Sequence, residues 1–146
     1  MEDCIFCRIA AHQAPADVIA QSDEAIVFLS LENHPLVVPR AHIATIYSLD
    51  DALGAALMRW TVRVARALKS GLGCEGVFVA QANEPAGGQD VFHLHIHVIP
   101  RWQGDPPVWQ FRQVRDPALR EQRRAAIAAA LAAEDQGSAL PTGATI

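Results

Sequence analysis

The alternation of histidine with apolar residues in FHLHIHVIPR, residues 92–101, constrains the fold of this chain more than any other feature. Successive side chains of a β-strand point to opposite faces, so His93, His95 and His97 share one face. The outer two histidines then lie about 13 Å apart, which makes it unfavourable for all three to bind one ion. We therefore predict a strand over 92–99 whose histidine face forms a site and whose apolar face packs on a helix.

Three further runs of branched and aromatic residues predict strands, at 25–29, 36–38 and 76–82. A long helix is predicted between the second and third runs, with Ser48 as its N-cap and Gly71 as its C-cap. Its apolar residues recur every three or four positions and are Leu53, Leu57, Trp60, Val64 and Leu68. Connections short enough for antiparallel pairing favour an α+β domain.

The C-terminal part of the chain predicts a second helix, with Asp116 as N-cap and Pro117 at the first helical position. The final DQGSALPTGATI combines small and turn-forming residues without a period, which is typical of a disordered tail. We therefore divide the chain into a domain over 1–115, a helix over 116–134 that packs on the domain or on a partner subunit, and a disordered tail over 135–146.

Composition and charge narrow the classes of function. The 146 residues suffice for one domain with a substantial core. The net charge of -4 argues against nonspecific binding of nucleic acid, although six arginines cluster after residue 100. We expect no membrane association, because no apolar stretch approaches the ~20 residues of a membrane span. The N-terminus does not resemble a secretory signal, and three cysteines cannot all pair, so a cytoplasmic location is expected.

Three histidines on one strand face indicate a site, since histidine is neither a strong strand former nor an inexpensive core residue. Two chemistries remain open. An H-x-H pair could bind a catalytic metal with water as nucleophile, or an imidazole could itself be the nucleophile. The preceding loop NEPAGGQD, residues 83–90, could bring backbone N–H groups and the amides of Asn83 and Gln89 to a phosphate, or it could be an ordinary hairpin turn.

The motif GQDVFHLHIHVIPR resembles the signature of the histidine triad (HIT) superfamily. The stretches DCIFCRI, AIVFL and HPLVVPRAH and the long predicted helix also match in order, so the resemblance covers residues 3–105. It implies a five-stranded antiparallel sheet with one long and one shorter helix, followed here by a C-terminal extension, and usually a homodimer. It also implies a reaction at the α-phosphate of a nucleotide through a nucleotidyl-histidine intermediate.

The resemblance assigns separate roles to the histidines. His95 would attack phosphorus through one ring nitrogen while a main-chain carbonyl of its own strand holds the other. His97 would face the phosphate or the leaving group, and His34, the fourth histidine of the family, would support the row. Imidazole suits this chemistry because it is a nucleophile near neutral pH, and a covalent step divides one difficult displacement into two.

The resemblance also implies where the nucleotide binds. Phosphate oxygens would meet the main chain of Gly88 and Gln89, with Asn83 nearby, because preorganised donors best stabilise the charge of the transition state. The base pocket would be lined by apolar side chains, namely Ile5, Phe6 and Ile9. Apolar stacking favours purines, so a purine nucleotide is the expected substrate.

Cys4 and Cys7 form half of a possible metal site. Zinc prefers four nitrogen or sulfur ligands, so two histidines are needed to complete it. The resemblance supplies them, since family members that keep both cysteines complete the zinc with histidines that correspond to His42 and His93. Four protein ligands leave no open position for a catalytic water, so the expected zinc is structural. The alternative is that both cysteines are buried apolar residues.

Two features depart from the pattern of the family. The loop before His34 is shortened to residues 30–33, and Ser30 stands where the family has an aspartate that holds the ribose hydroxyls. Asp90 stands where several relatives have serine or threonine. A carboxylate cannot donate to phosphate and would repel it, so we expect the side chain of Asp90 to point away from the site.

These features together predict a nucleotide phosphoramidase or hydrolase that acts on a purine nucleoside monophosphate conjugate. Dinucleoside polyphosphate hydrolysis and nucleotidyl transfer are alternatives that use the same histidine. A nucleotide-binding interaction protein with little catalysis, and a metal-dependent hydrolase that uses H-x-H directly, are alternatives from other classes.

Overall fold

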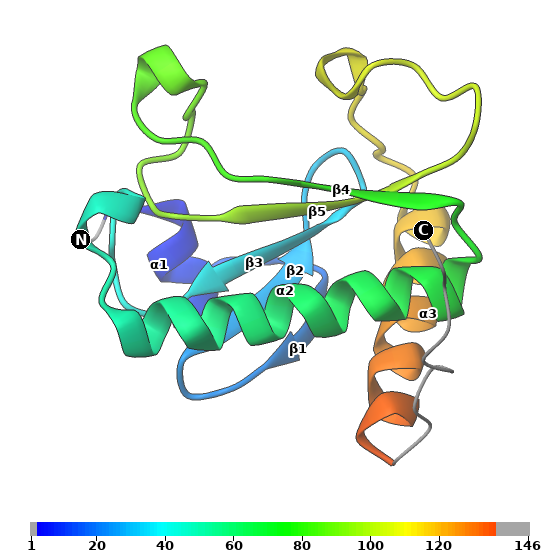
Figure 1. The fold of residues 1–146 in the computed structure, drawn as a ribbon, viewed down its shortest axis with the longest axis horizontal. Helices are drawn as coiled ribbons and strands as arrows, with labels where there is room; N and C mark the ends of the chain where they lie inside the picture. Colours follow the sequence, from blue (N-terminus) through cyan, green and yellow to red (C-terminus); the bar gives the residue numbers. More distant parts are fainter. Residues whose placement is uncertain (1–2, 137–146) are drawn as a thin grey trace.

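A computed structural model describes residues 3–136 and contains the four predicted strands and both predicted helices, with shifted ends and with further elements (Figure 1). The strands are β1 (Val18–Gln21), β2 (Ala25–Leu29), β3 (Pro35–Pro39), β4 (Gly76–Ala80) and β5 (Ile96–Arg101). The α-helices are α1 (Ile5–Ala10), α2 (Asp51–Leu72) and α3 (Pro117–Asp135), and the 3-10 helices are η1 (Ile46–Ser48), η2 (Pro85–Gly87) and η3 (Val108–Gln110).

The five strands form one sheet in the order β1-β2-β3-β5-β4, and each neighbouring pair is antiparallel. The helix α2 carries the chain from β3 to the outer strand β4, and β5 then returns between them. The predicted α+β class and the five-stranded antiparallel sheet are therefore confirmed. The sequence patterns did not predict β1 as an individual strand.

The two faces of the sheet bury different sets of side chains because strand residues alternate between faces. Val27, Val37 and Val98 pack with the buried residues of α2, and α3 lies across the C-terminal part of α2 and adds its own apolar residues (Figure 1). The opposite face packs against α1, with Phe6 and Phe28 in edge-to-face contact at 5.4 Å between ring centroids. The predicted stripe of α2 faces the first of these clusters.

Both predicted ends of α2 are wrong by a short distance. The N-cap is Asp50, whose carboxylate accepts a hydrogen bond from the main-chain N–H of Leu53 at 2.8 Å, and not Ser48. The C-cap is Gly73, which has a φ of 65°, and not Gly71. A β carbon on Gly71 would lie 2.9 Å from the main-chain oxygen of Ala126, so this glycine instead allows α2 and α3 to approach closely.

The predicted strand over 92–99 begins later than expected. Regular pairing starts only at Ile96, so His93 and His95 lie in an irregular segment that leads into β5. Phe92, which was expected to pack on the helix, is 53% exposed. The alternating pattern therefore correctly predicted that neighbouring histidines lie together. It did not predict the residue at which hydrogen bonding to a neighbouring strand begins.

The predicted C-terminal helix is present as α3, and its N-cap Asp116 accepts a hydrogen bond from the N–H of Ala118 at 2.9 Å. It extends through Asp135, one residue beyond the predicted end, and packs mainly against α2 of the same chain. Most of the predicted tail, residues 137–146, lies outside the described residues. Within residues 3–136, none of the helices combines the length and apolar character needed to cross a membrane.

Candidate functional site

His95 has one ring nitrogen held by the main chain and the other exposed to a pocket. Its Nδ1 lies 2.8 Å from the main-chain oxygen of His93, so Nδ1 carries the proton that this carbonyl accepts. The Nε2 atom of the neutral ring then keeps a lone pair and can attack an electrophile. Phe6 packs edge-on against the imidazole with ring centroids 5.1 Å apart, which further fixes its orientation. A main-chain carbonyl therefore holds this nitrogen as the resemblance implies, but it belongs to the irregular segment before β5 and not to the regular strand.

His97 and His34 form a hydrogen-bonded pair beside His95. Nε2 of His34 lies 2.9 Å from Nδ1 of His97, and the rings of His95 and His97 have centroids 5.0 Å apart. Burial, reinforced by neighbouring imidazoles, lowers the pKa of His34 to about 3. Burial and the proximity of His95 lower the pKa of His97 to about 4, although the carboxylate of Asp90 acts in the opposite direction. Both rings are therefore neutral near pH 7.

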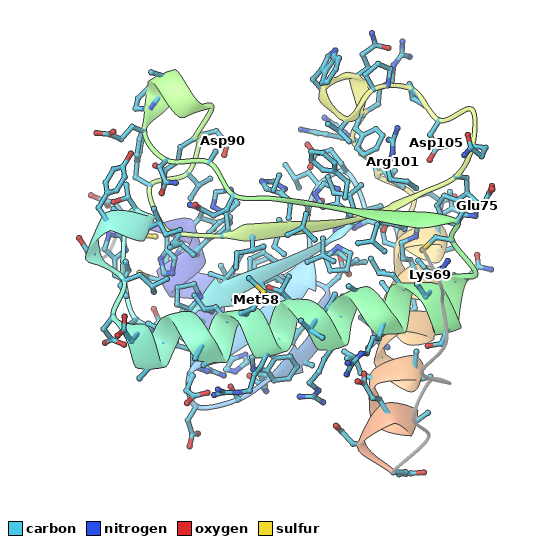
Figure 2. All side chains as sticks on the ribbon, in the orientation of Figure 1. Met58, Lys69, Glu75, Asp90, Arg101 and Asp105 are labelled. Carbon is cyan, nitrogen blue, oxygen red and sulfur yellow. The ribbon has the colours of Figure 1, made fainter. Side chains whose placement is uncertain are left out.

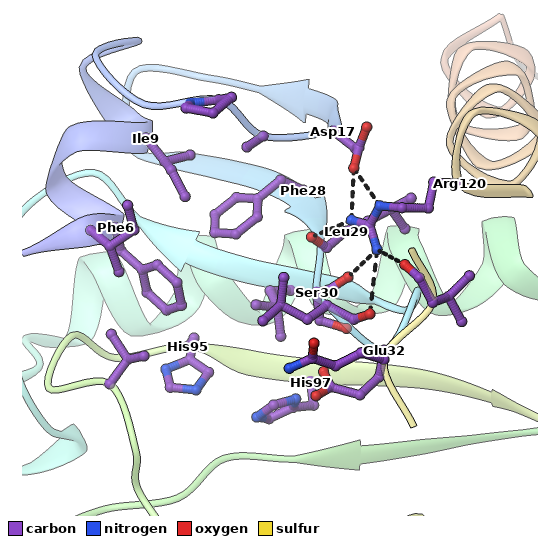
Figure 3. A pocket seen from close by; sticks show the side chains of 18 of the residues that line it. Phe6, Ile9, Asp17, Phe28, Leu29, Ser30, Glu32, His95, His97 and Arg120 are labelled. Atoms are coloured by element: carbon purple, nitrogen blue, oxygen red, sulfur yellow. Dashed lines mark hydrogen bonds and ion pairs between the residues drawn. The ribbon is translucent and has the colours of Figure 1, made fainter. Parts of the chain in front are cut away.

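A pocket of about 610 Å³ lies against His95 and His97, a size that suits a small-molecule ligand. Figure 3 shows Phe6 and Ile9 at one end of this pocket and Asp17 with Arg120 at the other, with the two histidines along one side. Ile5 also lines the pocket, so all three residues predicted for the base pocket are brought together beside the predicted nucleophile. His34 lies behind His97 and does not line the cavity.

The side chain of Asp90 does not point away from the site, contrary to the prediction from sequence. Asp90 lines the pocket, and its Oδ1 lies 3.7 Å from Nε2 of His95. The same oxygen accepts a hydrogen bond from the main-chain N–H of Val91 at 2.8 Å, which turns the carboxylate toward the histidine. Figure 2 labels Asp90 on the connection between β4 and β5, at the other end of the molecule from Arg101 and Asp105.

The residues predicted to bind phosphate are occupied within their own loop. The main-chain N–H groups of Gly88 and Gln89 donate to the carbonyls of Pro85 and Glu84, at 3.0 and 3.1 Å. The Gln89 amide donates to the carbonyl of Ala44 at 2.7 Å. These hydrogen bonds fix the conformation of the loop. Phosphate binding by Gly88 and Gln89 stays a prediction, because their main-chain N–H groups would have to break these internal hydrogen bonds to donate to a phosphate.

Asn83 also makes hydrogen bonds that stabilise this part of the chain. Its side-chain oxygen accepts from the main-chain N–H of Ile46 at 2.7 Å, and its amide nitrogen donates to the side-chain oxygen of Gln81 at 2.7 Å. Asn83 therefore joins the loop to η1 and does not line the pocket. Its predicted contact with phosphate stays a prediction.

The shortened loop before His34 forms a tight turn rather than an open rim. Ser30 donates its main-chain N–H to the carbonyl of His34 at 2.8 Å, and its hydroxyl accepts from the N–H of His34 at 3.2 Å. Asn33 adopts a φ of 68°, which lets so short a connection reverse the chain. Ser30 lines the pocket while its hydroxyl closes the turn, and Glu32 brings a carboxylate to the same cavity.

Arg120 of α3 links the turn at residues 30–33 to Asp17 and Val114 on other parts of the pocket wall. Its Nη2 lies 2.7 Å from Oδ2 of Asp17, and its Nη1 donates to the carbonyls of Ser30 at 2.9 Å and Val114 at 3.2 Å. The N–H of Val114 in turn donates to the carbonyl of Leu31 at 2.8 Å. These contacts bring Gln113, Val114 and Arg115 into the pocket wall. The arginine-rich composition was the only signal in the sequence, and it did not single out Arg120.

A second cluster includes His93, the first histidine of the row. It consists of Cys4, Cys7, His42 and His93, whose candidate ligand atoms all lie within 4.8 Å of one another. The Sγ atom of Cys7 is 3.2 Å from Nδ1 of His42 and 3.5 Å from Nδ1 of His93, and Sγ of Cys4 is 3.4 Å from the latter. Tetrahedral zinc bonds place sulfur and nitrogen ligands roughly 3.5 Å apart.

The protonation of His93 also suits a metal ligand. Its Nε2 lies 2.7 Å from the main-chain oxygen of Pro39, which fixes the proton on Nε2 and leaves Nδ1 free to face the cysteines. Burial lowers the pKa of His93, which favours the neutral ring that a metal requires. The four residues predicted from the sequence could therefore hold one metal ion.

The comparisons with known proteins agree with this geometry. A family model described as the HIT domain matches residues 11–104. "Protein hit" of Bacillus subtilis (strain 168) is 32% identical over 116 residues, covering 75% of this chain and 80% of that protein. "Adenosine 5'-monophosphoramidase hnt1" of Schizosaccharomyces pombe is 31% identical over 102 residues, covering 67% of this chain and 74% of that protein.

The fold is similar to that of a solved "ZN-bound histidine triad family protein" from Mycobacterium smegmatis. That structure matches with a TM-score of 0.82 and 32% identity, and the match covers 94% of this chain and 99% of the other. The family model spans all five strands and the histidine row. The chain belongs to the histidine triad (HIT) family.

Proposed function

We propose that the protein is a nucleotide phosphoramidase or hydrolase that attaches a purine nucleoside monophosphate to His95 before releasing it to water. The observation that carries this proposal is the free Nε2 of His95 at the wall of a 610 Å³ pocket, with Nδ1 held by the His93 carbonyl. Nε2 would displace the leaving group from the α-phosphate, and water would then displace Nε2. The similarity to an adenosine 5'-monophosphoramidase supports the first substrate to test.

The hydrogen bond between His34 and His97 supports a role for His97 as a hydrogen-bond donor to the phosphate or the leaving group. Nδ1 of His34 is buried without a hydrogen-bond partner in the part of the chain that the structure describes. A proton there would be costly, so the proton of His34 belongs on Nε2 and is donated to Nδ1 of His97. The neutral ring of His97 then carries its proton on Nε2. It can donate this hydrogen bond without changing its charge.

The apolar end of the pocket supports a purine base. Ile5, Phe6 and Ile9 of α1 line it together with Phe28 of β2. Flat apolar walls favour stacking of a large base and provide few donors or acceptors to distinguish one purine from another. An adenosine phosphoramidate and its guanosine counterpart are therefore both suitable probes.

A chemical quench tests the covalent step. The protein is mixed with AMP phosphoramidate, stopped in alkaline denaturant to preserve the phosphorus–nitrogen bond, and digested for mass mapping. We expect one added AMP on the peptide that contains residues 93–97, at His95. Faster labelling by a dinucleoside polyphosphate would favour that alternative reaction. Nucleotide binding without labelling or turnover would instead favour the interaction-protein alternative.

Within the same proposal, Cys4, Cys7, His42 and His93 hold a structural zinc ion. The two thiols, the two free Nδ1 atoms and the spacing of the four ligand atoms fit tetrahedral zinc. Such an ion would join α1 to the segment before β5 and keep the His93 carbonyl in place for His95. Free thiols and thiolate ligands suit a reducing compartment, which supports a cytoplasmic location.

The proposal includes a homodimer formed along β4. This strand lies at the edge of the sheet and exposes Phe78 and Val79 at 44% and 47%. An unpaired edge with apolar side chains favours pairing with another strand, and a two-fold axis would join two copies of the same edge. Sedimentation equilibrium should show a dimer that Phe78→Asp dissociates, while Leu119→Asp on α3 does not. A monomeric native protein at micromolar concentration would contradict this assembly.

A further inference from the structure

The carboxylate of Asp90 is a charged group beside the proposed nucleophile to which the proposed reaction gives no role. Its Oδ1 lies 3.7 Å from Nε2 of His95, the atom that would bond to phosphorus. The hydrogen bond from the N–H of Val91 to the same oxygen holds the group in this position, although the side chain is 84% exposed. Any phosphoryl group on Nε2 would therefore lie beside a fixed negative charge.

The other charged groups of the pocket do not cancel this charge locally. Asp17 and Arg120 form an ion pair at the other end of the cavity (Figure 3). Glu32 and Arg115 carry opposite charges and both line the pocket. The neutral rings of His34 and His97 contribute no net charge. Among the described residues, Asp90 is the charged side chain within ion-pair distance of Nε2 of His95, at 3.7 Å.

We propose that Asp90 is a specificity-determining residue that favours α-phosphates with one negative charge over phosphate groups with two. This inference rests on the proposed function. The α-phosphate of a phosphoramidate, a phosphodiester or a polyphosphate carries one negative charge, whereas a nucleoside monophosphate carries nearly two above its second pKa of about 6. Asp90 therefore repels the product more strongly than the substrate, which promotes product release and disfavours binding of free nucleoside monophosphates.

Two ligands that differ mainly in phosphate charge provide the test. AMP is a dianion at pH 8, and its 5'-methyl phosphate ester is a monoanion of nearly the same shape. The Kd of each is measured at low salt with native protein and with Asp90→Asn, whose side-chain oxygen can still accept from the N–H of Val91. We expect the ratio of the Kd of AMP to that of the ester to fall by about tenfold in the variant.

Glu84→Gln is the matched control, because Glu84 lies in the same connection, contacts Tyr47 and does not line the pocket. It should change the ratio by less than about twofold, since its charge is more distant and screened. Asp90→Ser provides a second variant should the asparagine variant fold poorly. A ratio that stays at the native value in both Asp90 variants would overturn the inference.

The quench experiment distinguishes failure of the inference about Asp90 from failure of the proposed function. If native protein forms nucleotidyl-His95 but the two Asp90 variants keep the native ratio, only the role of Asp90 is wrong. If native protein forms no such adduct and binds neither ligand, the proposed function fails and the inference about Asp90 is overturned with it.

Discussion

Replacement of His95 by asparagine is expected to lower kcat/KM for AMP phosphoramidate by at least about a thousandfold and to abolish covalent labelling. The amide can still occupy the space beside Phe6, but its nitrogen has no lone pair available for attack on phosphorus. The readouts are steady-state release of AMP and the mass of the peptide that contains residue 95. His95 is only 4% exposed, so thermal melting must first show that the variant is folded.

His12→Asn is the matched control for this substitution. His12 lies after α1, is exposed and has a φ of 57°, a conformation that asparagine tolerates well. The kcat/KM of the His12→Asn variant for AMP phosphoramidate should remain within about twofold of the value for native protein. Substantial turnover by His95→Asn that depends on added metal would contradict the covalent mechanism and favour direct metal-dependent hydrolysis.

Cys7→Ser is expected to lose bound zinc and to lower Tm by about 10 °C or more, because the binding energy of a structural metal contributes directly to folding. The Sγ atom of Cys7 lies within 3.5 Å of Nδ1 of both His42 and His93, so the substitution removes a thiol that faces both rings. Turnover should fall as well, since His93 supplies the carbonyl that holds His95. Metal analysis, thermal melting and activity are measured on the same preparation.

Cys74→Ala controls for the loss of a thiol elsewhere in the chain. Cys74 is buried in the core on the α2 side of the sheet and lies outside the four-residue cluster. This variant should retain the zinc content of native protein even if its Tm is lower. A full complement of zinc in Cys7→Ser would show that the proposed set of ligands is wrong.

Patterns that depend on local chemistry were predicted well from the sequence. The period of α2 identified the residues that face the sheet, and alternation placed His93, His95 and His97 on the site side of the chain. The cysteine pair with His42 and His93 forms a compact cluster as expected. The first two predictions rest on a side-chain period, whereas the choice of His42 and His93 as partners of the cysteines rests on the resemblance to the family.

Features that depend on contacts between distant segments could not be predicted in this way. The direction of Asp90 follows from its hydrogen bond with the N–H of Val91, just before the predicted strand, where the alternating pattern gives no information. Gly71 was interpreted as a helix end because glycine is common there, but its role depends on where α3 crosses. The contact of Arg120 with Asp17 joins residues 103 positions apart.

The ion pair between Arg120 and Asp17 can form only after α3 has been synthesised. The family match ends at residue 104, yet the cavity wall includes residues 113–115 held by Arg120. A nascent chain emerges from the ribosome N-terminus first, and its sheet and histidines are available before α3. The cavity beside His95 is therefore among the last parts to form, and a chain interrupted before Arg120 carries His95 without the contacts that hold this part of the cavity wall.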